Sequence, residues 1–187
     1  MNEAPETAVA IRPATASDIG AVAAIYGHHV AGGLASFELE PPTVDEMRRR
    51  YDEIRSRGFP YLIAVRECRI IGYAYASAYR ARPAYRFSVE NSVYIDAGAQ
   101  RGGAGRLLLE SLIHHCEDAG FRQMIAVIGD SANAASIGLH AACGFAQVGT
   151  LPAVGFKFGR WVDSVLMQRA LGPGETTLPD QGVQACM

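Results

Sequence analysis

The chain has 187 residues and a mass of 20.0 kDa, which suits one domain with a complete hydrophobic core. It is 49% hydrophobic and 19% charged, a composition typical of globular proteins. Its net charge is −2, with no long run of Lys and Arg, so neither nucleic acid nor an anionic membrane surface is expected as its main partner.

The sequence carries no pattern typical of a membrane span, a signal peptide or a metal site. No apolar stretch approaches the roughly 20 residues of a spanning helix, and the acidic start, MNEAPETAVA, lacks the pattern of a signal peptide. The four cysteines are scattered without a CxxC pair, which is typical of reduced thiols in a cytoplasmic protein. The histidines at 28–29 and 114–115 are adjacent pairs that point apart on a helix, so no metal site is expected.

The first half of the chain predicts a short strand at 9–13, two helices and three strands. Capping boxes, Thr15 with Asp18 and Thr43 with Glu46, open the two helices, and Gly58 ends the second. Strands are expected at 61–65, 69–79 and 86–95, with a hairpin turn at RECR between the first two.

The second half predicts a helix from Gly103 to Gly120, a buried strand at 123–129, a helix at 131–145 and two strands within 146–171. The step from the strand ending at 95 to the strand at 123–129 is a right-handed crossover between parallel strands. The predicted fold class is α/β, with a mixed, mostly antiparallel central sheet covered by helices on both faces. We expect one domain over residues 9–171, a flexible start at 1–8 and a disordered tail at 172–187.

A glycine-rich turn joins a strand to a helix in the segment VYIDAGAQRGGAGRLLLE at 93–110. Glycines at a helix start expose backbone N–H groups that bind phosphate oxygens. The P-loop motif fails because its lysine is missing, and a dinucleotide fingerprint fails because leucine stands at its third glycine. The remaining reading is the pyrophosphate turn of an acetyl-CoA enzyme, [RQ]xxGx[GA], which Gln100, Gly103 and Gly105 satisfy.

Four stretches in the same order resemble the GNAT superfamily of acyl-CoA-dependent N-acyltransferases: SVENSVYI, QRGGAG, AVIGDSANAASIGLHAACGF and GTLPAVGFKFGRWVDSVLMQ. Over residues 9–171 the chain looks most similar to the branch that acetylates phosphinothricin and methionine sulfoximine or sulfone. The sequence departs from the family at Ala97, where proline is usual, and at Gln100-Arg101, where Arg-Gly is usual. We expect a less rigid turn there, with binding retained.

Glu90 is the expected general base, because acetylation requires a neutral amine and a proton acceptor. Strand alternation places Glu90, Ser92 and Tyr94 on one face and residues 89, 93 and 95 on the other. The resemblance also puts the proposed base at this position. The alternative is a structural salt bridge of Glu90 with Arg80 or Arg86.

The resemblance implies the cofactor contacts. Backbone groups of Val93, Tyr94 and Ile95 are expected to bond the pantetheine arm of acetyl-CoA. The turn is expected to hold the pyrophosphate, with charge from two arginines; its residues are Gln100, Arg101, Gly102, Gly103, Ala104, Gly105 and Arg106.

The next helix is expected to present one polar stripe at i, i+3 and i+7, formed by Asn133, Ser136 and His140. The resemblance assigns Asn133 to the cofactor. His140 stands where the family often has a tyrosine that protonates the departing thiolate. His140 and Tyr94 are therefore both candidate acids, and a structural role for the histidine is the alternative.

On the substrate side, arginines near Glu90 suit the carboxylate of an amino acid. Arg80 and Arg86 are the expected partners of that carboxylate, and the resemblance adds Tyr79, Phe37 and Lys157 as substrate-binding residues. Lys157 and Trp161, in GFKFGRWVD, are expected either to close the pocket or to form a dimer interface.

The sequence thus predicts an N-acetyltransferase that moves acetyl from acetyl-CoA to a small-molecule amine by direct attack, without a cysteine nucleophile. The family implies a homodimer. The alternatives are an enzyme acting on a peptide N-terminus or another amine such as an aminoglycoside, and a non-catalytic acetyl-CoA sensor.

Overall fold

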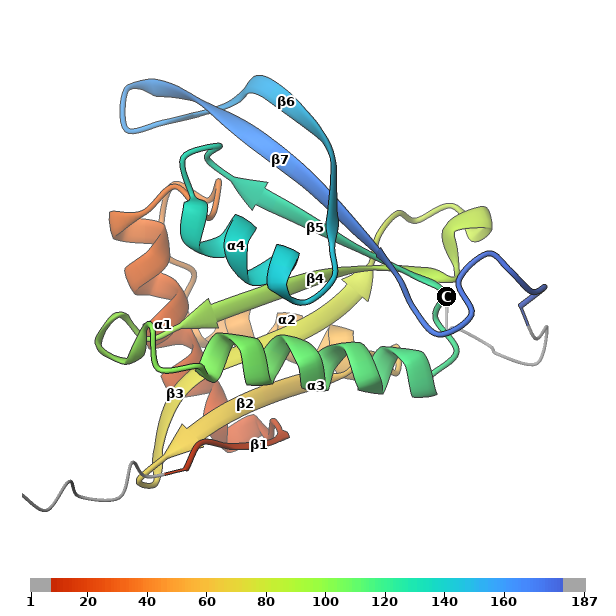
Figure 1. Ribbon diagram of the computed structural model, residues 1–187. Coiled ribbons are helices and arrows are strands. Elements are labelled where there is room, and N and C mark those ends of the chain that lie inside the picture. The colour runs from red at the N-terminus through yellow and green to blue at the C-terminus, as the bar shows by residue number, and fades with distance from the viewer. Residues whose placement is uncertain (1–7, 180–187) are drawn as a thin grey trace, which may run out of the picture.

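The computed structural model describes residues 8–179, which form a seven-stranded sheet in the order β1-β2-β3-β4-β5-β7-β6 (Figure 1). Only the β4–β5 pair is parallel, as the crossover prediction required. The strands are β1 (Ala10–Pro13), β2 (Tyr61–Arg66), β3 (Arg69–Ala78), β4 (Ser88–Ile95), β5 (Gln123–Gly129), β6 (Ala146–Lys157) and β7 (Arg160–Ala170).

Helices cover both faces of this sheet, which confirms the predicted fold class (Figure 1). The helices are α1 (Ile19–Gly32), α2 (Val44–Ser56), α3 (Ala104–Asp118) and α4 (Ala134–Ala142). One core lies under α3 and α4, and a second, rich in tyrosine, lies under α1 and α2. Neighbouring side chains of the central strands alternate between these cores, as a period of two requires. Within the described part of the chain, no helix combines the length and the apolar character needed to cross a membrane.

The two predicted capping boxes differ in outcome. Thr15 and Asp18 form the first, where a 3₁₀ turn, Ala16–Asp18, leads into α1. At the second, the Thr43 hydroxyl accepts from the N–H of Glu46 at 3.2 Å, so Thr43 caps α2. The Glu46 carboxylate instead binds the guanidinium groups of Arg49 and Arg50, at 2.8 and 2.7 Å. The reciprocal half of that box was therefore predicted wrongly, because two arginines compete for the carboxylate.

Asp18 gives a test of the N-terminal cap. Its carboxylate accepts from Arg12 at 2.8 Å and from the Thr15 N–H at 2.7 Å, and these bonds lower its pKa to about 2. We expect Asp18→Ala to reduce the free energy of unfolding by about 1–2 kcal/mol, measured by urea denaturation. Because the folded-state pKa is depressed, this contribution is present above about pH 4 and is lost as the pH falls toward 2. An equal loss at pH 2 and pH 7 would contradict it.

The predicted boundaries shift at two places. A 3₁₀ turn, Pro83–Tyr85, delays the start of β4 to Ser88. Residues 172–179, in the predicted tail, form turns that Arg122 holds through the carbonyl oxygens of Gly174 and Leu178, both at 3.1 Å. The rest of the predicted tail, 180–187, and residues 1–7 of the predicted N-terminus lie outside the described residues.

Candidate active site

The two parallel strands at the centre of the sheet separate along their length. β4 pairs with β5 only from Ser88 to Asn91, whereas it pairs with β3 as far as Ile95. The second half of β4 therefore has a free edge toward β5, and Figure 1 shows the two strands diverging there. An unpaired strand edge presents backbone N–H and C=O groups that an extended ligand can bond.

A cavity of about 60 Å³ lies at this separation. It is lined by β4 from Asn91 onward, the end of β5, α4 with its N-cap residue, and Ala35 from the segment between α1 and α2. The lining residues are Ala35, Asn91, Ser92, Val93, Tyr94, Ala126, Val127, Ile128, Gly129, Asn133, Ser136 and His140. Five residues predicted to be in the site are thus brought together, namely Val93, Tyr94, Asn133, Ser136 and His140. Ile95 is on the same strand, and its carbonyl oxygen lies 2.8 Å from His29 Nε2.

The predicted anion-binding turn leads from β4 to the start of α3. Gly103 is the N-cap residue of α3 with φ of +77°, a conformation that favours glycine. Arg101 is exposed with φ of +63°, and Arg106 is occupied by an ion pair with Glu110 at 2.7 Å. Sequence reasoning missed Arg66, whose guanidinium lies 3.3 Å from the Gly102 carbonyl oxygen and supports the turn from the β2–β3 hairpin.

Glu90 is half-buried in the middle of β4, on the face covered by α1 and α2. Burial raises the pKa of its carboxyl group, and the nearby charge of Arg80 offsets part of that rise. Among the described residues, no ion pair joins Glu90 to an arginine, so the structural salt bridge considered from sequence is not formed. The carboxylate is therefore free to accept a proton.

The predicted arginine pair does not converge. The Arg80 guanidinium lies over the Tyr79 ring at 5.2 Å, on the side of Glu90. Arg86 instead lies over the Phe87 ring at 4.6 Å and donates to the Pro83 carbonyl oxygen. Both side chains are exposed. Arg80 is thus the arginine whose charge acts on Glu90, and Arg86 is directed elsewhere.

Tyr94 belongs to a group of packed rings, with Tyr26 at 5.0 Å and Tyr73 at 5.3 Å. Burial raises the pKa of its phenol far above the usual value, so the hydroxyl keeps its proton.

The predicted helical stripe also changes. Asn133 precedes α4 and caps it, because its side-chain oxygen accepts from the Ser136 N–H at 3.1 Å. His140 lies in the last turn of α4 and is 4% exposed. One of its hydrogen-bond partners is Asn91, which was not predicted to be in the site. The missed signal was an asparagine on the apolar face of β4, between Val89 and Val93.

Lys157 is buried at the end of β6 and does not point its ammonium group into the cavity. Its Nζ donates to the carbonyl oxygens of Val30 and Ser36, both at 2.8 Å. It therefore joins the end of α1 and the segment before α2 to the β6–β7 hairpin. Burial lowers its pKa, and Glu38 partly offsets this.

The segment 33–38 packs closely against the end of β5 and against β6. A Cβ atom at Gly129 would lie 2.3 Å from the Leu34 carbonyl oxygen, and one at Gly155 would lie 3.0 Å from the Phe37 ring. Tyr26 anchors the same segment by hydrogen bonds of 2.8 Å to Ser36 and Glu38. Phe37 thus lies against Gly155 of β6 and does not line the cavity, whereas Ala35 of the same segment does.

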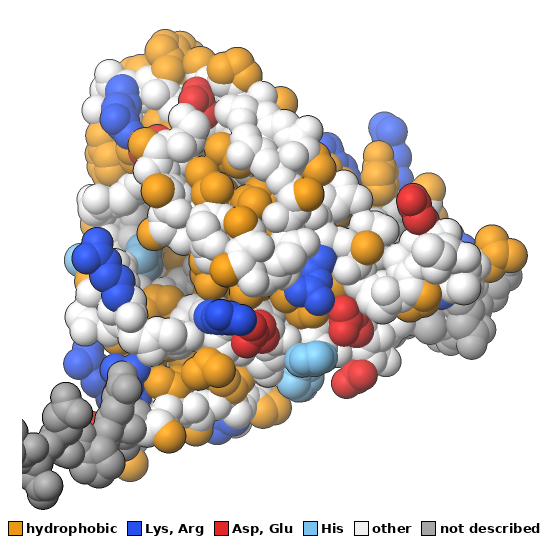
Figure 2. Space-filling model, in the orientation of Figure 1, with side chains coloured by type: hydrophobic (Ala, Val, Ile, Leu, Met, Phe, Trp, Pro, Cys, Tyr) orange, Lys and Arg blue, Asp and Glu red, His pale blue; other side chains and the backbone are white. Residues whose placement is uncertain are grey.

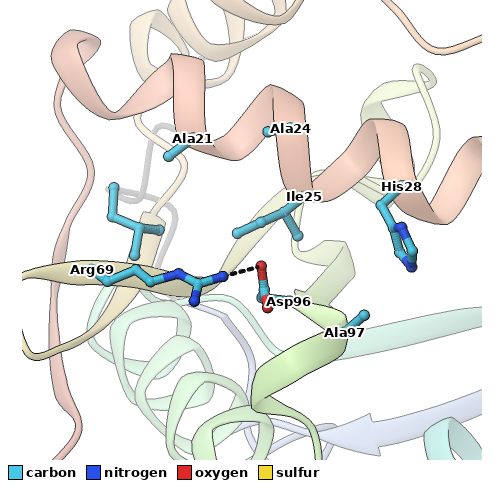
Figure 3. A pocket seen from close by; sticks show the side chains of 8 residues that line it. Ala21, Ala24, Ile25, His28, Arg69, Asp96 and Ala97 are labelled. Atoms are coloured by element: carbon cyan, nitrogen blue, oxygen red, sulfur yellow. Dashed lines mark hydrogen bonds and ion pairs between the residues drawn. The ribbon is translucent and has the colours of Figure 1, made fainter.

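A larger cavity, of about 330 Å³, lies between α1 and the residues that follow β4 (Figure 3). Figure 3 shows Arg69 and Asp96 paired beneath α1, at 3.0 Å, with His28 on the helix above them. The free edge of β4 does not line this cavity, whereas it lines the smaller one; Glu90, on the other face of β4, lines neither. The smaller cavity is therefore the candidate active site. Within the described residues, no three His, Cys, Asp or Glu side chains gather as metal ligands would.

Two parallel strands that separate, a glycine turn at the start of α3 and a half-buried carboxylate are the features expected of an acyl-CoA-dependent acyltransferase. The model of the Acetyltransferase (GNAT) family matches residues 27–145, and the chain belongs to that family.

The comparisons with individual proteins agree. The chain is 54% identical to a phosphinothricin N-acetyltransferase of Alcaligenes faecalis, covering 95% of this chain and 90% of that one. It is 36% identical to an L-methionine sulfoximine/L-methionine sulfone acetyltransferase of Salmonella typhimurium, over 91% and 98% of the two chains. A crystal structure of a phosphinothricin acetyltransferase from Sinorhizobium meliloti, in complex with AcCoA, superposes with a TM-score of 0.91. Its sequence is 46% identical to this chain, and the match covers 94% of this chain and 95% of the chain in that structure.

Proposed function

We propose that this enzyme transfers an acetyl group from acetyl-CoA to the α-amine of a small amino acid or analogue. Phosphinothricin, methionine sulfoximine and methionine sulfone are the first candidates, since relatives named for them match nearly the whole chain. The observation that carries the proposal is the free edge of β4, which lies between the glycine turn and Glu90.

The residues have distinct tasks in this proposal. Backbone groups of Val93, Tyr94 and Ile95 extend the sheet onto the pantetheine arm, and the amides of residues 101–106 receive the pyrophosphate. Glu90 takes the proton from the attacking amine, directly or through water, while Arg80 faces the substrate carboxylate. His140 and Tyr94 are the candidate donors to the departing sulfur, and both line the cavity.

The test is release of free thiol from acetyl-CoA by the purified protein with a panel of amines. The panel holds the three analogues, common amino acids, a peptide and an aminoglycoside. We expect release with amino acids or analogues and none with the peptide or the aminoglycoside. Release with the peptide alone would favour a protein N-terminal acetyltransferase. Binding of acetyl-CoA without release for any amine would favour the sensor.

The glycine turn gives a separate test of cofactor binding. Gly103→Ala meets no atom within 4 Å, so its only cost is the φ of +77°. An L-residue in that region costs roughly 1–2 kcal/mol, which the free protein can avoid by relaxing the turn; restoring the turn on binding would then make acetyl-CoA bind about 5–30-fold more weakly. The change would be measured by calorimetric titration, with Gly138→Ala on the exposed side of α4 as the control. Unchanged affinity would remove Gly103 from the proposed site.

We also propose a homodimer formed through the β6–β7 hairpin. Large apolar side chains are exposed there, and Figure 2 shows hydrophobic atoms at that end of the molecule. They are Val148, Leu151, Val154, Phe156, Phe158 and Trp161. Several large apolar side chains exposed on one hairpin are typical of an interaction site.

Trp161→Glu tests this interface, because Trp161 is 67% exposed and packs on Phe156 at 5.1 Å. We expect light scattering to give twice the 20.0 kDa of the chain for the native protein and a single chain mass for the variant. Val44→Glu, on α2, is the control for an added charge at an exposed apolar residue. A native protein of one chain mass would refute the dimer.

We place the enzyme in the cytoplasm. Cys68, Cys116 and Cys143 are free thiols, which suits a reducing compartment.

A further inference from the structure

Asn91 is a buried polar residue, 6% exposed, at the last paired position of β4 with β5. Its side chain points to the α3–α4 side of the sheet, into the candidate active site. A buried amide is costly unless its polar groups are hydrogen-bonded. The partners of Asn91 therefore show what the residue does.

The orientation of the Asn91 amide is determined by the main chain. Its Nδ2 lies 3.1 Å from the Ile125 carbonyl oxygen, which can only accept, so the nitrogen must face that atom. The amide oxygen Oδ1 then faces Nε2 of His140, at 3.0 Å. Reversing the amide would bring two oxygen atoms together at Ile125.

The other nitrogen of His140 also faces an acceptor. Nδ1 lies 2.8 Å from the carbonyl oxygen of Ser136, and the Ser136 hydroxyl lies farther away, at 3.5 Å, so the carbonyl is the main partner. Neutral imidazole has one N–H, whereas the imidazolium ion has two. Both contacts of His140 are hydrogen bonds only when the ring carries both protons.

We propose that Asn91 is a positioning residue that keeps His140 doubly protonated in the resting enzyme, with the Nε2 proton held in the candidate active site. The catalytic role of His140 in this inference rests on the proposed function, whereas its protonation state can be measured independently of that function.

Opposing effects act on the ring. Burial lowers the pKa of His140, and the Ser136 carbonyl raises it in part. Two further features favour the cation: the Asn91 oxygen, and the position of the ring in the last turn of α4, where the helix dipole is negative. The ring packs edge-on against Phe145 at 5.1 Å. Within residues 8–179, no charged side chain forms an ion pair or hydrogen bond with it.

The protons and bonds of the transfer balance with this arrangement. The amine nitrogen forms the new bond to the acetyl carbon, the carbon–sulfur bond breaks, and Glu90 takes the proton that the nitrogen loses. His140 gives its Nε2 proton to the sulfur and becomes neutral; before the next cycle Glu90 releases its proton to solvent and His140 regains one. With the proton gone, Nε2 and the Asn91 oxygen are two facing acceptors, which favours reprotonation.

The experiment is ¹⁵N NMR of the histidine rings in the full chain, with His140→Gln used to assign the signal. At pH 7 we expect both ring nitrogens of His140 to be protonated. In Asn91→Leu, which matches the side chain in size but offers no acceptor, we expect the protonated fraction to fall at least tenfold relative to the neutral one. Gln168→Leu removes a side-chain amide at an exposed position of β7 and is expected to leave the signal unchanged.

A neutral His140 with a single N–H in the native protein at pH 7 would overturn the proposal. So would an unchanged ratio in Asn91→Leu. If that variant does not fold, Asn91→Asp retains the acceptor and is expected to keep both protons on the ring, and a neutral ring there would also refute the inference. Because none of these measurements requires turnover, a silent amine panel beside a doubly protonated His140 would reject only the proposed function.

Discussion

Replacing Glu90 with glutamine is expected to lower kcat by roughly 10²–10⁴-fold and to change the Kd for acetyl-CoA little. Glutamine has nearly the same shape as glutamate but cannot take a proton from the amine. Glu90 also lies on the opposite face of β4 from Val93, so the cavity that would hold the cofactor keeps its lining. Steady-state kinetics and calorimetric titration would measure the two quantities.

The pH dependence gives the same hypothesis a second test. Burial raises the pKa of Glu90 above that of a free carboxyl group, and Arg80 opposes this only in part. Because the ionised form is the base, kcat/KM is expected to fall as the pH falls through this raised pKa, and Glu90→Gln should lack that limb. Glu53→Gln, on the exposed face of α2, is the matched control. Native turnover in Glu90→Gln would exclude Glu90 as the base.

The local features of the site were predictable because short-range rules determine them. Alternation along SVENSVYI placed Val89 and Val93 on one face and Tyr94 on the other, and a period of two leaves no other arrangement. The glycine turn was likewise readable, since Gly103 needs its positive φ at the start of α3. Both signals lie within a few residues of the positions that they explain.

The features that were not predictable depend on contacts between distant segments. The point at which β4 leaves β5 is set by packing, so the sequence did not show that Asn91 would be the last paired residue. Of the two arginines predicted near Glu90, only Arg80 acts on its carboxyl group, because the ring of Phe87 competes for Arg86. Lys157 was expected at the substrate, yet its carbonyl partners lie more than 120 residues earlier in the chain.

That placement of Lys157 implies a large effect on both stability and the acceptor substrate. We expect Lys157→Met to lower the free energy of unfolding by about 2–4 kcal/mol, because the buried carbonyl oxygens of Val30 and Ser36 lose their donor. Methionine keeps the length and apolar stem of lysine, so the loss reports the ammonium group. Urea denaturation would measure it.

The same variant should weaken use of the amino acid substrate without weakening binding of acetyl-CoA. The segment that Lys157 holds carries Phe37, which is a predicted substrate-binding residue and does not line the cofactor cavity. We therefore expect the KM for the amino acid to rise about tenfold while the Kd for acetyl-CoA stays the same. Arg160→Met, three residues away, breaks an exposed ion pair with Asp130 and should cost less than about 1 kcal/mol with native kinetics. If Lys157→Met were destabilised but kept its native KM, the segment would serve the fold alone, and the acceptor would have to be recognised from the side of Arg80.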